Sequence, residues 1–397
     1  MFKMKKKPKK KKKNVDDSDS DCDKEDPISV DKEGYRTYQV PGVVCSNFDD
    51  TVMHFIHARG LNPGNVRVLV GLDDGQKFNK IGFVLKDVER EDQEGRVRRD
   101  QGLFPKRFKD SGVKSLFLAA VVPVTPENHH NQKTLLEALG MEGLEWSMTV
   151  DLKMANILVG KESGQPTHGC CFCDMGKPYT EEEYNLLTLQ DVVENHDMFV
   201  ADGSKKKDQA KYQNFVNPHL LAGEPTDKVL GIINIPELHC IIGVVDKHII
   251  GLENIFGIEW MDQYLKDVCI LRKSYQGGHA LEGNQSSEFL KKLPVLERKI
   301  MEAPDEQKVE GLPLLESLRC FRQVQEACFG QQLKDNYEDC IKKFSKTYRG
   351  LDNMSITPKI HIIEKHIIDF FRDREGHHGE DNLFFKIIIQ NITLLKV

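Results

Sequence analysis

Two pairs of residues in this chain have the types and the spacing of zinc ligands. Cys170 and Cys173 form a Cys-x2-Cys pair, and His361 and His366 form a His-x4-His pair. Structural Zn²⁺ is usually held tetrahedrally by four thiolate sulfurs or imidazole nitrogens. The two pairs together therefore predict a Cys2His2 zinc site. The alternative is that the thiols are buried without a metal and the histidines belong to the core.

Two neighbours leave the ligand assignment open, because His168 and Cys171 lie close enough to the cysteine pair to replace one of its members. The chain has ten cysteines at uneven spacing, which favours reduced thiols inside a cell over a disulfide framework. Since the two ligand pairs are far apart in sequence, we expect zinc to join the sheet domain to the last helical segment.

Two aspartates follow segments that have the pattern of β-strands. Asp73 follows the β-branched, apolar segment 66–72, and Asp151 follows the segment 146–150. Carboxylates suit Mg²⁺ or Mn²⁺, and two such ions can activate a nucleophile and stabilise a leaving oxygen in phosphodiester chemistry. The alternatives are a hairpin turn at Asp73-Asp74-Gly75, in which Asp74 is equally placed, and a helix N-cap at Asp151.

The elements that would position these aspartates follow the order strand, strand, strand, helix, strand. We expect the strands at 66–72, 80–85, 115–122 and 146–150, and the helix from the Thr125-Pro126-Glu127 start to about Leu139. After Cys173 the apolar spacing is mostly helical. The prediction is an α/β fold with an RNase H-like (retroviral-integrase-type) mixed sheet core, a large helical insertion and a zinc-braced helical region.

The chain is expected to have four regions. They are a disordered Lys-rich and then acidic tail (1–33), the RNase H-like core (34–160), the Cys-x2-Cys pair with the helical insertion (161–358), and the histidine helix with an atypical C-terminal tail (359–397).

The charge distribution limits the partners of the protein. Nine lysines lie within residues 1–13, although the whole chain has a net charge of −6. The lysines suggest a nuclear-localisation signal or a phosphate-binding arm, and the alternative is a solubilising tail. The acidic remainder means that any nucleic-acid contact must be local. No apolar run reaches membrane-spanning length.

On these motifs the chain resembles the catalytic subunit of the V(D)J recombinase and the related Transib-type, recombination-activating-like DDE transposases. The shared features are the GLDDGQ turn, an aspartate nineteen residues before the first cysteine, the PELHC segment 236–240, the Gly283-Asn284 helix start and the His-x4-His pair. The resemblance covers about residues 65–375.

The resemblance implies metal-dependent hydrolysis of DNA phosphodiesters followed by strand transfer. Asp73 and Asp151 would hold Mg²⁺ or Mn²⁺, while Cys170, Cys173, His361 and His366 would hold a structural zinc. The resemblance also implies DNA as a partner, a homodimer and a nuclear location.

The chain departs from this family at the third catalytic acid. The family has a glutamate about twenty residues beyond the second zinc histidine, and that distance falls on Lys386. Glu375 and Glu380 are the nearest acids, and Glu380 is the candidate. The tail after residue 376 has no clear helical pattern, which suggests a change of reading frame there.

The protein is therefore expected to be a DDE-type transposase or recombinase, inactive if its third acid is missing. The competing hypothesis is a non-catalytic, transposase-derived nuclear protein that binds DNA or protein. A cellular nuclease of the same fold is a third alternative.

Overall fold

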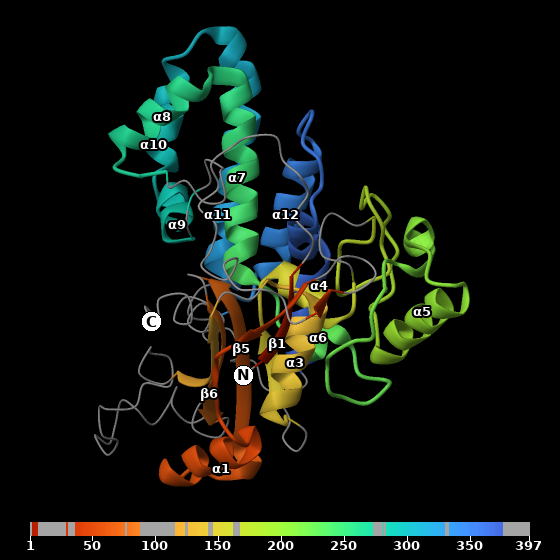
Figure 1. Ribbon diagram of the computed structural model, residues 1–397. Coiled ribbons are helices and arrows are strands. Elements are labelled where there is room, and N and C mark those ends of the chain that lie inside the picture. The colour runs from red at the N-terminus through yellow and green to blue at the C-terminus, as the bar shows by residue number, and fades with distance from the viewer. Residues whose placement is uncertain are drawn as a thin grey trace. The chain divides into compact units, whose positions relative to one another are not determined.

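The computed structural model in Figure 1 describes residues 2–6, 29–30, 36–75, 78–87, 116–123, 126–141, 146–161, 167–272, 281, 283–329 and 333–375. The chain folds into two units. Of the described residues, unit 1 contains those up to Asp174 together with Asn185–Asn234, and unit 2 contains Met175–Tyr184 together with those from Ile235 to Glu375. Within the described ranges, no helix is both long enough and apolar enough to cross a membrane.

A mixed five-stranded sheet forms the centre of unit 1, with the strand order β4-β7-β6-β5-β8. The strands are β4 (Val43–Val44), β5 (Val66–Gly75), β6 (Phe78–Asp87), β7 (Phe117–Pro123) and β8 (Trp146–Thr149). Strands β5, β6 and β7 are successive antiparallel neighbours, whereas β8 pairs parallel with β5. The structure thus confirms the predicted mixed α/β class and the four predicted strands.

The first hairpin differs from the prediction at Asp73-Asp74-Gly75. These residues are the end of β5 and not a turn, because the pairing with β6 continues to Gly75 and Phe78. Asp73 lies directly opposite Lys80 in this register. Opposite charges on paired strands stabilise each other, which is consistent with the longer strand.

Helix α1 covers one face of this sheet. It spans Phe48–Ala58, and the side chain of Asn47 caps its start by accepting a hydrogen bond from the Asp50 amide. Phe48 packs edge-on against Phe83 of β6, and Phe55 packs on Phe117 of β7 with ring centroids 3.9 Å apart. Residues 83 and 117 are paired across the strands, so the aromatic rings form one cluster on that face.

The remaining helices of unit 1 follow the sheet strands in the chain. They are α3 (His129–Leu139), α4 (Leu152–Leu158), α5 (Leu189–Ala201) and α6 (Val229–Ile232), with 3-10 turns at Pro63–Asn65 and Lys206–Tyr212. Helix α3 begins later than the predicted Thr125-Pro126-Glu127 start, of which Thr125 lies outside the described residues. The side chain of Asn128 accepts a hydrogen bond from the Asn131 amide, and this cap sets the start of the helix.

A small antiparallel sheet contains the first residues of the chain, in the order β1-β3-β2. Its strands are β1 (Phe2–Lys6), β2 (Ser29–Val30) and β3 (Arg36–Val40). This differs from the expectation of a disordered segment 1–33 at residues 2–6 and 29–30; the rest of that segment is outside the described residues. Met4 is buried and the preceding Lys3 is exposed, as expected for successive residues of a strand.

Unit 2 is helical, as the predicted insertion is. Its helices are α7 (Glu237–Phe256), α8 (Ile258–Asp267), α9 (Gly283–Lys291), α10 (Leu293–Met301), α11 (Asp305–Cys328), α12 (Tyr337–Arg349), α13 (Pro358–His361) and α14 (Ile367–Glu375). Helix α11 packs against both α7 and α12, as Figure 1 shows.

A buried histidine joins α7 to α11. His248 is fully buried, with Nδ1 2.8 Å from the Val244 carbonyl oxygen and Nε2 2.9 Å from the Ser317 hydroxyl. Because the carbonyl can only accept, Nδ1 carries the proton and Nε2 accepts the hydrogen bond from Ser317. Burial lowers the pKa of His248 from 6.5 to about 4.

This histidine is expected to make unit 2 less stable in mild acid. In the unfolded chain, His248 binds a proton with a pKa near 6.5, whereas in the folded chain its pKa is about 4. Stability should therefore fall as pH falls through this window, by at most about 3 kcal/mol. Urea unfolding of the wild type and of His248→Gln between pH 7 and 4 gives the free energy of unfolding at each pH, and this energy should fall more steeply with decreasing pH in the wild type. Equal pH dependence in the two proteins would show that His248 does not titrate in this way.

Candidate metal centre and carboxylate cluster

The cysteine pair lies in a short loop of unit 1 that many hydrogen bonds hold. Cys170 and Cys173 are completely buried. The Phe172 amide donates to the Cys170 sulfur over 3.4 Å, and the Phe172 carbonyl accepts from the Leu187 amide. The backbone of the loop therefore positions the Cys170 sulfur.

The histidine pair lies in unit 2 on a helix with unusual geometry. Residues Ile362–His366 form a π-helical turn between α13 and α14. In a regular α-helix, residues five apart point about 140° away from each other. In a π turn, whose hydrogen bonds join residues five apart, they lie on the same side. The Nε2 atoms of His361 and His366 are accordingly 3.0 Å apart.

The two pairs together form one buried set of candidate metal ligands. The ligand atoms of Cys170, Cys173, His361 and His366 all lie within 4.8 Å of one another. Tetrahedral zinc, with bonds of about 2.0–2.3 Å, needs its ligand atoms roughly 3.3–3.8 Å apart. Small side-chain movements would meet that requirement, so this cluster could hold a structural zinc.

The alternative ligands are not part of this set. Among the described residues, the four above are the only such group, and it contains neither His168 nor Cys171. The backbone amide of His168 donates a hydrogen bond to the side chain of Asn214 over 2.9 Å, and this bond fixes the backbone of the loop.

Carboxylate and aromatic groups of unit 2 surround the histidines. Asp369 Oδ2 lies 3.7 Å from His366 Nδ1 and accepts a 2.5 Å hydrogen bond from the Tyr184 hydroxyl. Burial alone would raise the pKa of Asp369, but its interactions with His366 and Tyr184 lower it below its usual value. Tyr179 stacks on His361 with ring centroids 4.8 Å apart. Such contacts orient imidazole rings toward a metal.

The parallel pairing of β5 with β8 brings the two predicted catalytic aspartates to the same edge of the sheet. Gly71 pairs with Thr149, and Asp73 and Asp151 each follow two residues later. The side chain of Asp151 also caps α4 by accepting a hydrogen bond from the Met154 amide over 2.7 Å. The N-cap alternative for Asp151 is therefore confirmed, and it does not exclude a role in metal binding.

A buried lysine accompanies Asp73. Lys80 is fully buried, and its Nζ lies 3.5 Å from Asp73 Oδ2. Burial raises the pKa of Asp73, the positive charge of Lys80 opposes this rise, and the negative charge of Asp151 adds to it. Asp73 Oδ2 is buried and accepts no hydrogen bond of good geometry from the described residues.

The structure adds a third carboxylate, which the sequence analysis treated only as an acid in a first helical turn. Burial raises the pKa of Glu127, an ion pair with Lys153 opposes the rise, and both Asp151 and Asp73 add to it. The negative charges of both aspartates therefore act on the Glu127 carboxylate. The sequence feature that could have identified Glu127 is its position directly after the third predicted strand. That strand ends at the same end of the sheet as the strands that precede Asp73 and Asp151.

The carboxylates are less close-packed than the zinc ligands. Among the described residues, no set of three carboxylates has oxygens grouped as tightly as the Cys2His2 atoms. The carboxylate oxygens suit Mg²⁺ or Mn²⁺. Glu380 lies outside the described residues, and Glu375 is the last residue of α14.

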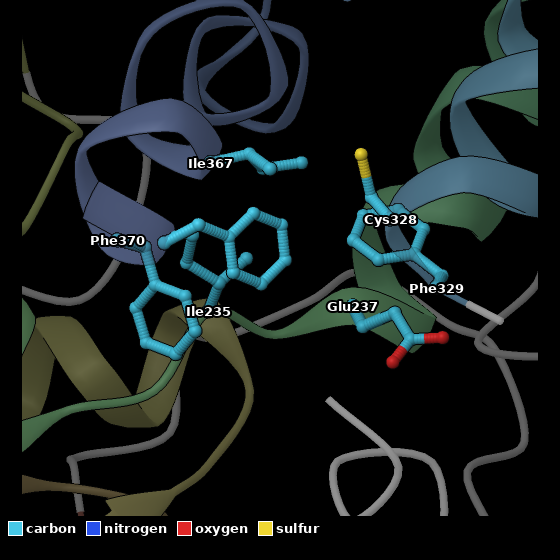
Figure 2. Close-up of a pocket in the computed structure, with 7 residues that line it drawn as sticks. Ile235, Glu237, Cys328, Phe329, Ile367 and Phe370 are labelled. Carbon is cyan, nitrogen blue, oxygen red and sulfur yellow. The ribbon is translucent and has the colours of Figure 1, made fainter. Parts of the chain in front are cut away.

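A small cavity in unit 2 does not serve as a substrate site. Figure 2 shows Ile367 and Phe370 of α14 on one side and Cys328 and Phe329 at the end of α11 on the other. The cavity has a volume of about 20 Å³. That is room for a water molecule and not for a nucleotide or a metabolite.

A family described as a domain of unknown function (DUF8703) matches residues 110–198, a stretch that includes Asp151 and both zinc-type cysteines. No curated protein matches the chain.

Proposed function

We propose that this protein is a DDE-type transposase or recombinase with an RNase H-like core, related to the recombination-activating-like and Transib-type families. One observation supports the proposal most. The strand order places two strands in parallel, so that Asp73 and Asp151 meet at one sheet edge. The predicted zinc site supports the same relationship, because the family combines both features.

In this proposal the substrate is a DNA phosphodiester. Asp73 and Asp151 hold Mg²⁺ or Mn²⁺, which would supply an activated water and stabilise the leaving oxygen. Glu127 is the third carboxylate that the described residues offer. Burial raises the pKa of Asp73, and the positive charge of Lys80 opposes that rise because it favours the ionised carboxylate. The DNA partner, a homodimer and a nuclear location are parts of the same proposal.

A second candidate is a non-catalytic DNA- or protein-binding protein derived from a transposase. Two ion pairs favour it, since Lys80 and Lys153 already compensate the charges of Asp73 and Glu127. A carboxylate with a fixed lysine partner has less need of a metal. In this alternative the zinc-braced fold persists without hydrolysis.

Nicking of supercoiled DNA distinguishes the two candidates. The purified chain is incubated with plasmid and Mg²⁺ or Mn²⁺, with EDTA in a parallel reaction. The DDE proposal predicts nicked circles only with the divalent ion, and none from Asp151→Ala. Absence of nicking by a folded, zinc-loaded protein would reject catalysis and favour the second candidate.

A further inference from the structure

The loop that carries the zinc-type cysteines is held by buried side chains from outside it. Lys161 Nζ donates to the carbonyl oxygens of His168 and Cys170, over 3.2 and 2.5 Å. Asn156 donates to the carbonyl of the residue between them, Gly169, over 3.2 Å. Three successive carbonyls thus accept hydrogen bonds from buried donors, and Lys161 provides two of the three.

We propose that Lys161 is a positioning residue for the cysteine half of the zinc site, holding the loop that presents Cys170 and Cys173. This proposal rests on the zinc site proposed above. The role is one of geometry, since Lys161 does not supply a ligand atom.

The side chain of Lys161 is enclosed beside the cysteine loop. It is 1% exposed, and its Nζ lies 4.7 Å from the centroid of the Phe215 ring. Among the described residues, no carboxylate forms an ion pair with it, and its hydrogen-bond acceptors are the two loop carbonyl oxygens.

A buried ammonium group is costly unless charges or hydrogen bonds compensate it. Carbonyl oxygens and an aromatic face compensate it here. The hydrogen bonds to the carbonyl oxygens of His168 and Cys170 therefore stabilise the buried lysine and the shape of the loop together.

The chain offers a matched control in its other fully buried lysine. Lys80 is 0% exposed and pairs with Asp73, away from the cysteine loop in the same unit. Replacement of either lysine by methionine removes a buried charge and keeps a similar volume. A general loss of stability should affect both variants, whereas a loss of zinc affinity should affect only one.

The test measures zinc affinity and dissociation with a chromophoric chelator, for the full chain and for the variants Lys161→Met, Lys161→Arg and Lys80→Met. Outer contacts of a metal ligand typically change metal affinity about 10–100-fold. We expect such a loss in Lys161→Met, partial recovery in Lys161→Arg, and wild-type affinity in Lys80→Met. The absorption spectrum of the Co²⁺-loaded protein should change in Lys161→Met alone.

The possible outcomes separate this inference from the zinc site itself. Zinc affinity in Lys161→Met equal to that of Lys80→Met would overturn the role of Lys161. If Lys161→Met does not fold, the Arg variant decides: a zinc affinity below that of Lys80→Met despite normal folding supports the role, and an affinity equal to that of Lys80→Met overturns it. A wild-type chain that carries no zinc would reject the metal site on which the inference rests.

Discussion

Replacement of Cys173 by serine is expected to release the zinc and destabilise the protein strongly. The wild-type chain should contain about one zinc ion, since four buried donors make one tetrahedral site. Structural zinc sites contribute on the order of 10 kcal/mol of binding free energy. With three ligands the ion is lost, and the remaining buried donors are left without it. We expect the free energy of unfolding to fall by at least about 3 kcal/mol.

Metal analysis and urea unfolding measure these two effects. Cys328→Ser is the matched control, because Cys328 is also a buried thiol but is not among the four ligands. That variant should retain its zinc even if the buried hydroxyl costs some stability. Full zinc content in Cys173→Ser would contradict the Cys2His2 assignment. Zinc loss in Cys328→Ser as well would mean that unfolding, and not ligand removal, releases the metal.

Asp151→Asn is expected to abolish DNA nicking while the fold is kept. Asparagine caps helices as well as aspartate does, so the hydrogen bond to the Met154 amide is retained. Only the negative charge is lost, and with it a strong ligand for Mg²⁺ or Mn²⁺. Metal-assisted stabilisation of a transition state is worth several kcal/mol, which corresponds to at least about 100-fold in rate.

The matched control for this variant is Asp197→Asn, which changes a largely exposed aspartate in the same unit. Asp73→Asn should lose activity as Asp151→Asn does. Glu127→Gln tests the third carboxylate, and a loss of roughly tenfold or more would place Glu127 in the site. Undiminished nicking by Asp151→Asn would show that the cleavage does not come from this cluster.

The strand segments and the ligand types could be predicted because they depend on local patterns. Apolar segments of β-branched residues identified β5 and β8, and the aspartates after them were visible as the ends of those segments. The Cys-x2-Cys pair was likewise recognisable, because its spacing alone suits a metal. The boundaries were less certain: β5 continued through Asp73 because Lys80 faces it, and that pairing is a property of two strands together.

Only the tertiary structure decided how the distant groups meet. A His-x4-His spacing places the rings apart on an α-helix, and the local π turn is what turns His361 and His366 to one side. Glu127 approaches the aspartates because the chain returns to the end of the sheet just before helix α3. Lys161 faces the cysteine loop although its type alone would suggest an exposed residue. The residue types with chemical potential were determined by the sequence itself, whereas their convergence depends on backbone geometry and on long-range packing that spacing does not encode.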